Sequence, residues 1–189
     1  MFVFRIKKEK VTLEGYIYYA GSYIISSDKM TYDIYLKHDP NVRLSQDDFK
    51  SYSDIELKFR LCLLDAFIYD KLLTRKLKIN NYDYGVALGK GLAMAFGSNG
   101  YDVNRISKMM NDLKQDFEGY KAYAIKNEYT FPKVMPILNY VFYYFSMKYF
   151  KNYSYDIDKN YTFGVLLKAN ELTIVEYLES TYKSVKIIN

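Results

Sequence analysis

Cysteine and histidine are almost absent from this sequence: among 189 residues each occurs once, as Cys62 and His38. A single cysteine cannot form a disulfide within the chain, and a zinc site of four cysteines, or of two cysteines and two histidines, is excluded as well. A Ser-His-Asp or Cys-His site would have to use His38, which stands in an Asp-Pro turn. Cys62 lies in an apolar run, where a thiol is usually inert packing. We therefore expect no enzyme activity, no metal and no cofactor.

Proline and glycine are also scarce, with three and nine residues, so long linkers are not expected. The first residues lack the charged-then-apolar order of a signal peptide. The most apolar stretch, residues 134–147, is 14 residues long, whereas a membrane-spanning helix needs about 20. The sequence thus predicts a cytoplasmic protein without a membrane span.

Aromatic residues are plentiful instead, with 23 tyrosines, 12 phenylalanines and no tryptophan. Apolar residues make up 50% of the chain and charged residues 26%, which excludes disorder for most of it. The net charge of +5 is below that of a dedicated DNA-coating protein. Because tyrosine, lysine, asparagine and isoleucine have AT-rich codons, we hypothesise an AT-rich microbial genome, or a phage or other mobile element, as the source.

Apolar and polar residues alternate with a period of two over residues 2–7, 11–14 and 32–37, a pattern typical of half-buried strands. We therefore predict an antiparallel β-meander over residues 1–40, which the segment His38-Asp39-Pro40-Asn41 ends. The fold class is α+β: a small N-terminal antiparallel β-meander followed by a mainly α-helical bundle over residues 41–189, together forming one compact unit.

The helical part begins with a short helix over 45–51. The capping box Ser53-x-x-Glu56 then opens a long helix to about Leu77, ended by Asn80-Asn81. This helix is apolar over more than half its circumference, so we expect it at the centre of the bundle. The remaining predictions include helices over 84–96 and from Asp102 to Ala124, and a helix whose start is marked by Thr130, Pro132 and Pro136 and which runs through Ile137 to about Phe150. A loop over 152–162, a strand over 163–167 and a last helix over 171–183 capped by Asn170 complete the prediction.

Gly85, Gly89 and Gly91 lie in one predicted helix, next to Lys90. A phosphate-binding loop is not favoured, because Lys90 precedes its glycine, Leu92 takes the hydroxyl position and no buried strand comes before. Each glycine inside a helix costs about 1 kcal/mol. Three of them therefore predict either close packing of another helix or a binding role.

Acidic residues form no convincing catalytic pair. Glu56 and Lys58 weakly match the arrangement of metal-dependent nucleases, in which carboxylates hold the metal and a lysine steadies the attacked phosphate. In a helix these two side chains point to different faces, so a nuclease is the least favoured alternative. Asp112 and Asp116 share a helix face with lysines nearby, which is typical of a solvated charged surface.

Tyrosine is enriched at protein interfaces, and the tyrosines are densest in the C-terminal half. The sequence favours a non-enzymatic interaction protein, an inhibitor or accessory factor that binds a partner protein, or a protein–nucleic-acid complex, through tyrosine-rich and charged surfaces. We predict that the following residues bind the partner: Tyr143, Tyr144, Tyr149, Tyr153, Tyr155 and Tyr161.

The alternative is a nucleic-acid-binding protein, in which lysines contact phosphates and tyrosines stack on bases. Lysine suits nonspecific backbone contacts better than the bidentate base reading that arginine provides. A homodimer through helix 84–96 or through the apolar helix 134–150 also stays open. The residues assigned to nucleic-acid binding are Lys7, Lys8, Lys10, Arg75, Lys76 and Lys78.

Overall fold

The computed structural model describes residues 8–27, 46–75, 80–127, 137–150 and 157–188, and it places their side chains except at residues 46, 48–51, 73–75, 81–82, 150 and 157–170. This part of the chain is mainly helical, as predicted. Its elements follow in the order β1 (Glu9–Thr12), α1 (Leu13–Ser27), α3 (Gln46–Arg75), α4 (Asn81–Ser98), α5 (Val103–Lys126), α6 (Ile137–Phe150), α7 (Ile157–Ser184) and β2 (Val185–Ile188).

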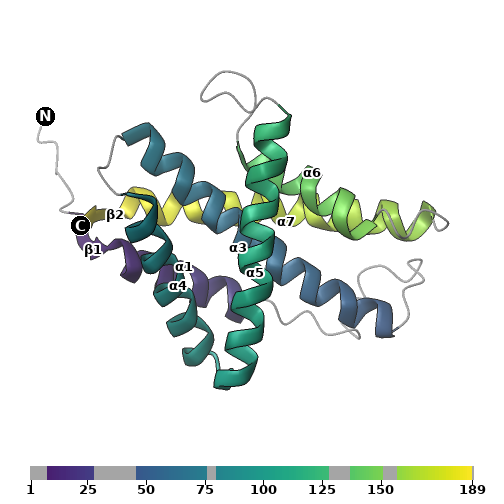
Figure 1. Ribbon diagram of the computed structural model, residues 1–189, viewed down its shortest axis with the longest axis horizontal. Helices are drawn as coiled ribbons and strands as arrows, with labels where there is room; N and C mark the ends of the chain where they lie inside the picture. The colour runs from purple at the N-terminus through teal and green to yellow at the C-terminus, as the bar shows by residue number, and fades with distance from the viewer. Residues whose placement is uncertain (1–7, 28–45, 76–79, 128–136, 151–156, 189) are drawn as a thin grey trace, which may run out of the picture.

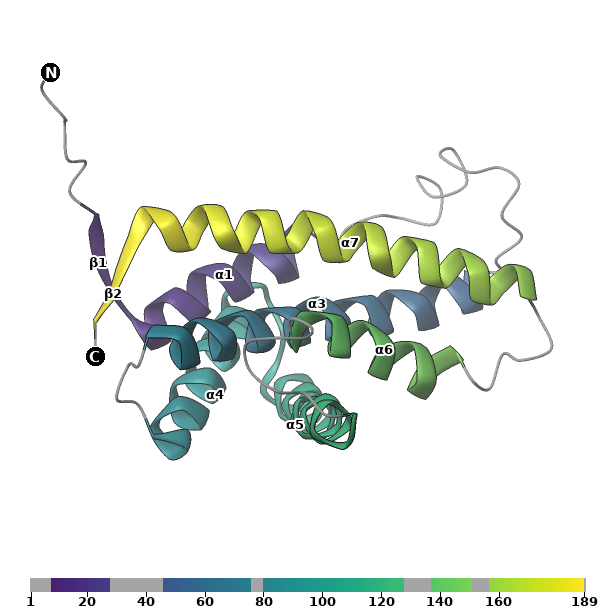
Figure 2. The same cartoon turned by 90° about the horizontal axis from the view of Figure 1, so that it is seen from above.

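The helices form three layers (Figures 1 and 2). In Figure 2, α7 forms one outer layer, α1, α3 and α6 lie in the middle, and α4 and α5 form the other outer layer. Helices α3 and α7 run along the long axis of the molecule, and α5 crosses them (Figure 1). Helix α3 packs against α1, α5, α6 and α7, so the prediction that it is the central helix is confirmed.

The composition of α3 explains its central position. All eight residues from 61 to 68 are buried, which requires neighbours on every side of the helix. Two of the largest fully buried side chains, Phe59 and Phe67, also come from α3. Helix α3 thus acts as the common core element on which the other helices pack.

Helix α3 begins at Gln46, so the predicted short and long helices are one element and the predicted capping box is wrong. Ser53 and Glu56 lie inside the helix, and Glu56 forms an ion pair with Arg60 one turn later. Tyr52 is buried in the additional turns. The burial of its ring outweighs the local capping signal at Ser53, as tertiary packing commonly overrides local propensity.

The predicted antiparallel meander is wrong. Of the described residues before position 40, Glu9–Thr12 form a strand and Leu13–Ser27 form α1. The alternating pattern was too short to separate a strand from the start of a helix. The buried apolar residues of α1 follow the helical spacing of three and four: Leu13, Tyr16, Ile17, Ala20 and Ile24.

The strand β1 pairs with β2, at the other end of the chain, and the pairing is parallel. Glu9 lies opposite Val185 and Val11 opposite Ile187. Residues 1–7 and 28–45, which include the rest of the predicted meander, lie outside the described residues. The two-stranded sheet lies at one end of the molecule, next to the start of α1 and the end of α7 (Figure 2).

Local signals fix the ends of α4 and α5. Asp102 caps α5 as predicted, and its carboxylate accepts a hydrogen bond from the Arg105 N–H at 2.9 Å. The turn before it contains Gly100 with φ of 82°, a conformation that glycine adopts without strain. Asn80, which was predicted to end the preceding helix, caps the following helix, α4, by accepting a hydrogen bond from the Asp83 N–H at 2.8 Å.

Helix α6 agrees with the prediction over Ile137–Phe150, and the predicted start at residues 130–136 lies outside the described residues. Helix α7 is longer than expected. It runs from Ile157 to Ser184, so the predicted strand over 163–167 and the predicted cap at Asn170 are wrong, and part of the predicted loop is helical. A short apolar run does not by itself distinguish a strand from a buried helix. The C-terminal half of α7 buries side chains four residues apart: Ile174, Leu178 and Tyr182.

Candidate functional site

The structure divides the predicted tyrosine cluster. Tyr143 is 47% exposed, whereas Tyr144 and Tyr149 point inward from α6 and donate hydrogen bonds to Asp116 of α5. Partner binding by Tyr143 therefore stays a prediction, while Tyr144 and Tyr149 have an internal role. The other members lie outside the described side chains: Tyr153, Tyr155 and Tyr161.

The Asp116 carboxylate binds one lysine ammonium and two tyrosine hydroxyls. Its Oδ1 lies 2.6 Å from Lys148 Nζ and 3.2 Å from the Tyr144 hydroxyl, and its Oδ2 lies 3.0 Å from the Tyr149 hydroxyl. Gly119 gives Tyr144 room to reach it, because a Cβ at this position would collide with the Tyr144 ring and hydroxyl. The carboxylate is buried, so the prediction that Asp116 belongs to a solvated charged face is wrong.

The electrostatics of this cluster hold its protons in place. Burial by itself lowers the pKa of the Lys148 ammonium, but the hydrogen bonds to Asp116 and Tyr144 reverse this and raise the pKa above its usual range. Burial, and then the negative charge of Asp116, raises the pKa of Tyr149. Groups that keep their protons so firmly are poor general bases near neutral pH. The cluster's hydrogen bonds and ion pair instead join α5 to α6, and we call such a contact a clamp.

A second buried carboxylate, Asp65 of α3, was not identified from the sequence. It accepts hydrogen bonds from the Tyr84 and Tyr120 hydroxyls, the latter at 2.5 Å, and its Oδ2 lies 2.8 Å from Lys121 Nζ. Burial raises the pKa of both tyrosines, and the charge of Asp65 raises it further. Asp65 thus clamps α3 to α4 and α5. Its position as the one charged residue in the eight-residue buried run of α3 is a signal that could have revealed it.

The glycines of α4 have two different environments. A Cβ on Gly91 would lie 2.7 Å from Ile17 Cγ2 and 2.9 Å from the carbonyl oxygen of Glu14, so Gly91 lets α1 approach closely. Close helix packing is therefore confirmed for this position. By contrast, nothing lies within 4 Å of a Cβ built on Gly85 or Gly89. These two line a pocket of about 640 Å³ between α3, α4 and α5.

A tyrosine-rich surface that the sequence did not reveal lies on α1 and α7. Tyr19 and Tyr23 of α1 are 64% and 42% exposed, and the Tyr23 ring stacks on Tyr177 of α7, with centroids 3.8 Å apart and planes at 14°. We call Tyr19, Tyr23 and Tyr177 the α1–α7 tyrosine face. A groove of about 360 Å³ beside it is lined by helix and strand residues that include Tyr19, Tyr177, Val11 and Val185.

The basic residues assigned to nucleic-acid binding lie partly at the sheet. Lys8 and Lys10 are exposed at β1, and Lys10 lies opposite Lys186, which is also exposed, in the parallel pair. Two exposed lysines thus occupy opposed positions on this short sheet. The remaining residues lie outside the described side chains: Lys7, Arg75, Lys76 and Lys78.

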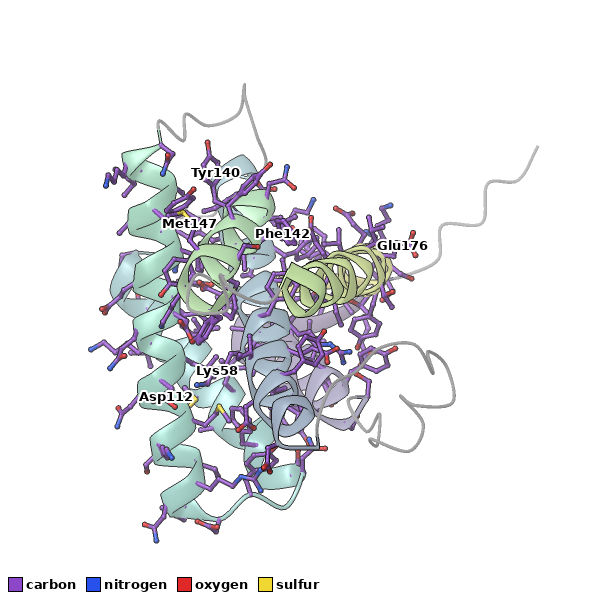
Figure 3. The ribbon with its side chains drawn as sticks, turned by 90° about the vertical axis from the view of Figure 1, so that its right-hand side faces the viewer. Lys58, Asp112, Tyr140, Phe142, Met147 and Glu176 are labelled. Atoms are coloured by element: carbon purple, nitrogen blue, oxygen red, sulfur yellow. The ribbon has the colours of Figure 1, made fainter. Side chains whose placement is uncertain are left out.

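The residues of the nuclease alternative are bound to other partners. Glu56 pairs with Arg60, and Lys58 Nζ lies 3.2 Å from Asp112 Oδ2, the two side chains pointing toward each other between α3 and α5 (Figure 3). Among the described residues, no group of three or more His, Cys, Asp or Glu side chains could hold a metal ion. Burial raises the pKa of the Cys62 thiol, which disfavours the nucleophilic thiolate.

None of the helices that the structure describes is both long and apolar enough to cross a membrane. In comparison with known proteins, the chain matches no family model, no curated protein and no solved structure. The surfaces and pockets described above are therefore the basis for a functional argument.

Proposed function

We propose that this chain is a non-enzymatic interaction protein that binds a partner protein through the α1–α7 tyrosine face. The observation that supports this proposal is the exposure of Tyr19 and Tyr23, at 64% and 42%, on one helix. A tyrosine ring contributes a large contact area at a low cost in side-chain entropy. The stacking of Tyr23 on Tyr177 orders two of the rings before a partner binds, which lowers that cost further.

The groove beside this face suits an extended segment of the partner. Among the described residues, β1 and β2 pair with each other and with no other strand, so each has an outer edge on which an added strand can form backbone hydrogen bonds. Val11 and Val185 from the strands and Tyr177 from α7 line the groove together. Backbone pairing would supply affinity, and the tyrosine-lined groove would select the partner's side chains.

The proposed role is that of an inhibitor or accessory factor of a phage or other mobile element. The support for this part is compositional: 22 of the 27 basic residues are lysine, and tyrosine reaches 23 residues, as AT-rich codon usage produces. A GC-rich coding sequence would contradict the proposed origin and leave the binding proposal unaffected.

The test is capture of a partner from a nuclease-treated lysate of the source organism by three forms of the protein. These are the wild type, the double variant Tyr19→Ser/Tyr23→Ser, and the matched control Tyr143→Ser/Met147→Ser, which alters two residues of α6 that are 47% and 52% exposed. We expect the first double variant to lose the partner and the control to retain it, with thermal unfolding unchanged in both. The opposite pattern would locate the binding surface on α6 and refute our proposal.

Nucleic-acid binding is a second candidate, supported by the position of Lys10 opposite Lys186. Like charges directly opposite each other are destabilising, and a polyanion would relieve their repulsion. Binding to single-stranded and duplex DNA should then weaken linearly on a log–log plot against salt, with a slope of about 0.7–0.9 per phosphate contact. The variant Lys8→Gln/Lys10→Gln should reduce that slope, and the absence of salt-dependent binding would exclude this candidate.

A further inference from the structure

The pocket between α4 and α5 has the size of a small-molecule site. Its volume of about 640 Å³ falls within the range of roughly 300–1,000 Å³ that such sites occupy. In Figure 1, α4 and α5 meet at the turn that joins them and separate from there, and α3 passes on their far side. The pocket lies in this region and is lined by aromatic, aliphatic and charged side chains from all three helices, among them Tyr69, Leu88, Met110 and Phe117.

Two glycines form one wall of the pocket. Gly85 and Gly89 are one turn apart on α4, and a Cβ on either would meet no atom within 4 Å. Glycine destabilises a helix relative to alanine, and no packing contact explains it here, in contrast to Gly91, where a Cβ would lie 2.7 Å from Ile17. The missing side chains leave the backbone of α4 open to close approach by a flat molecule.

A buried carboxylate holds a cation at the pocket. Lys121 lines the pocket, and its Nζ lies 2.8 Å from Oδ2 of the fully buried Asp65. The same ammonium lies 5.1 Å and 5.7 Å from the ring centroids of Tyr69 and Tyr84. An ammonium has three donors, so Lys121 can donate to a ligand while it stays bound to Asp65. Its position is therefore fixed before a ligand arrives, which favours binding.

Two further charges at the pocket set the charge of its ligand. Lys114 lines the pocket from α5, and it is exposed and in no ion pair with a described residue. Together with Lys121 it offers two ammonium groups to one anionic group. Glu118 lines the pocket as well; its carboxylate would repel a second anionic group but accept a hydrogen bond from a hydroxyl or amino group.

We propose that this pocket binds a small planar aromatic molecule with a single negative charge. The ring lies against the wall formed by Gly85 and Gly89 and contacts Phe117, and the anionic group is bound by Lys114 and Lys121. The pocket belongs to the α4–α5 layer, on the opposite side of the molecule from α7 (Figure 2). The proposal is therefore independent of partner binding at the α1–α7 tyrosine face.

The experiment uses two probes of nearly equal shape, 2-naphthoate and its neutral amide, 2-naphthamide. Titration calorimetry measures their affinity for the full chain, and amide NMR signals of Gly85 and Gly89 report the location. We expect saturable one-to-one binding of 2-naphthoate that is about fivefold or more tighter than binding of 2-naphthamide, because one charge is met by two lysines. In Lys114→Gln this preference for the anion should shrink.

A matched pair of variants tests the glycine wall. Gly89→Leu fills the pocket, whereas Gly97→Leu adds the same side chain to the same helix, at a position that likewise has no atom within 4 Å of its Cβ and does not line the pocket. We expect the first to weaken 2-naphthoate binding by about tenfold or more, which is 1.4 kcal/mol or more, and the second to leave it unchanged.

The proposal is overturned if 2-naphthoate does not bind saturably, if the amide binds equally well, or if the two leucine variants behave alike. Circular dichroism and thermal unfolding check that each variant is folded. If Gly89→Leu does not fold, Gly85→Leu, one turn earlier on the same wall, provides the same test.

Discussion

Asp65 and Asp116 are bound by the same set of groups in two different settings. Each carboxylate is buried and meets two tyrosine hydroxyls and one lysine ammonium. Around Asp65 both tyrosines are buried and the Lys121 side chain is 29% exposed, whereas Lys148 beside Asp116 is 36% exposed, and its two tyrosines are only half-buried.

This difference in burial decides how strongly each cluster stabilises the fold. Around Asp65 both tyrosine partners are buried, so little water can replace a lost hydrogen bond between a tyrosine hydroxyl and the carboxylate. Around Asp116 solvent reaches the partners and screens the charges. The same set of groups is therefore expected to stabilise the packing of α3, α4 and α5 around Asp65 more strongly than the packing of α5 on α6 around Asp116.

Alkaline pH should unfold the protein, because buried tyrosines must lose their protons. Burial raises the pKa of Tyr16 to about 12 and the pKa values of Tyr84 and Tyr120 well above 10. For a group whose pKa is raised in the folded state, stability is complete below the unfolded pKa, near 10, and is lost as pH rises toward the folded value. Phenolate absorbance and circular dichroism, followed together above pH 10, measure this effect.

The same titration tests the Asp65 cluster directly. Tyr120→Phe should remove phenolate absorbance from the step that coincides with loss of circular dichroism. Native circular dichroism in a protein whose tyrosines are all ionised would contradict the predicted role of the Asp65 cluster.

Asp65→Asn should lower the free energy of unfolding by about 3–5 kcal/mol, because it breaks the ion pair of a fully buried carboxylate with Lys121. The amide also loses one of the acceptor sites that Tyr84 and Tyr120 use. Urea unfolding at neutral pH measures the loss. A change below about 1 kcal/mol, the size expected for an exposed ion pair, would show that the cluster is not a clamp.

Asp116→Asn should cost less, about 1–3 kcal/mol, because solvent reaches Lys148 in the variant. Its effect should also shrink at high salt, whereas that of Asp65→Asn should not, since salt screens accessible charges more than buried ones. Urea unfolding at low and high salt compares the two variants directly. Equal salt dependence would remove the distinction that we draw between the clusters.

The smallest effect is expected at the outer pair of Lys58 and Asp112, whose side chains are 17% and 40% exposed. Asp112→Asn should change the free energy of unfolding by about 0–1 kcal/mol. This variant lies on the same helix as Asp116, one turn earlier, and is the control for both preceding substitutions. If Asp112→Asn lowered the free energy of unfolding as much as Asp116→Asn does, the solvent exposure of an ion pair would not determine how strongly that pair stabilises the fold.

The sequence predicts those elements whose signals are local. Asp102 caps α5 with its own side chain, and the apolar stripe of that helix has the helical period, so the structure agrees closely there. The central position of α3 also follows from its composition. The wrong predictions concern segments whose local signals are outweighed by contacts with distant residues. At Ser53 the local capping signal is outweighed by the packing of α3 against its neighbours. Strand β1 pairs with β2, which lies at the other end of the chain.

The candidate sites were harder to predict than the fold, because they combine residues from different helices. The cluster of tyrosines from 143 to 161 is dense in sequence, yet Tyr144 and Tyr149 turn toward Asp116 on another helix. In the α1–α7 tyrosine face, Tyr23 stacks on Tyr177. No pattern of residue spacing in the sequence predicts that these two tyrosines lie together. The three glycines of α4 stand out in the sequence, but the pocket beside Gly85 and Gly89 depends on how α5 crosses α3, and sequence alone does not give that crossing.

The pairing of β1 with β2 also constrains the order of folding during synthesis. Glu9 and Val185 are 176 positions apart (185 − 9). The ribosome therefore synthesises every described helix before it synthesises β2, the strand that pairs with β1. Helix α1 can pack on α4 earlier, since both helices are complete once Ser98 has been made. A product that stops before Val185 would also leave unpaired the edge of β1 that β2 covers, and exposed strand edges promote aggregation.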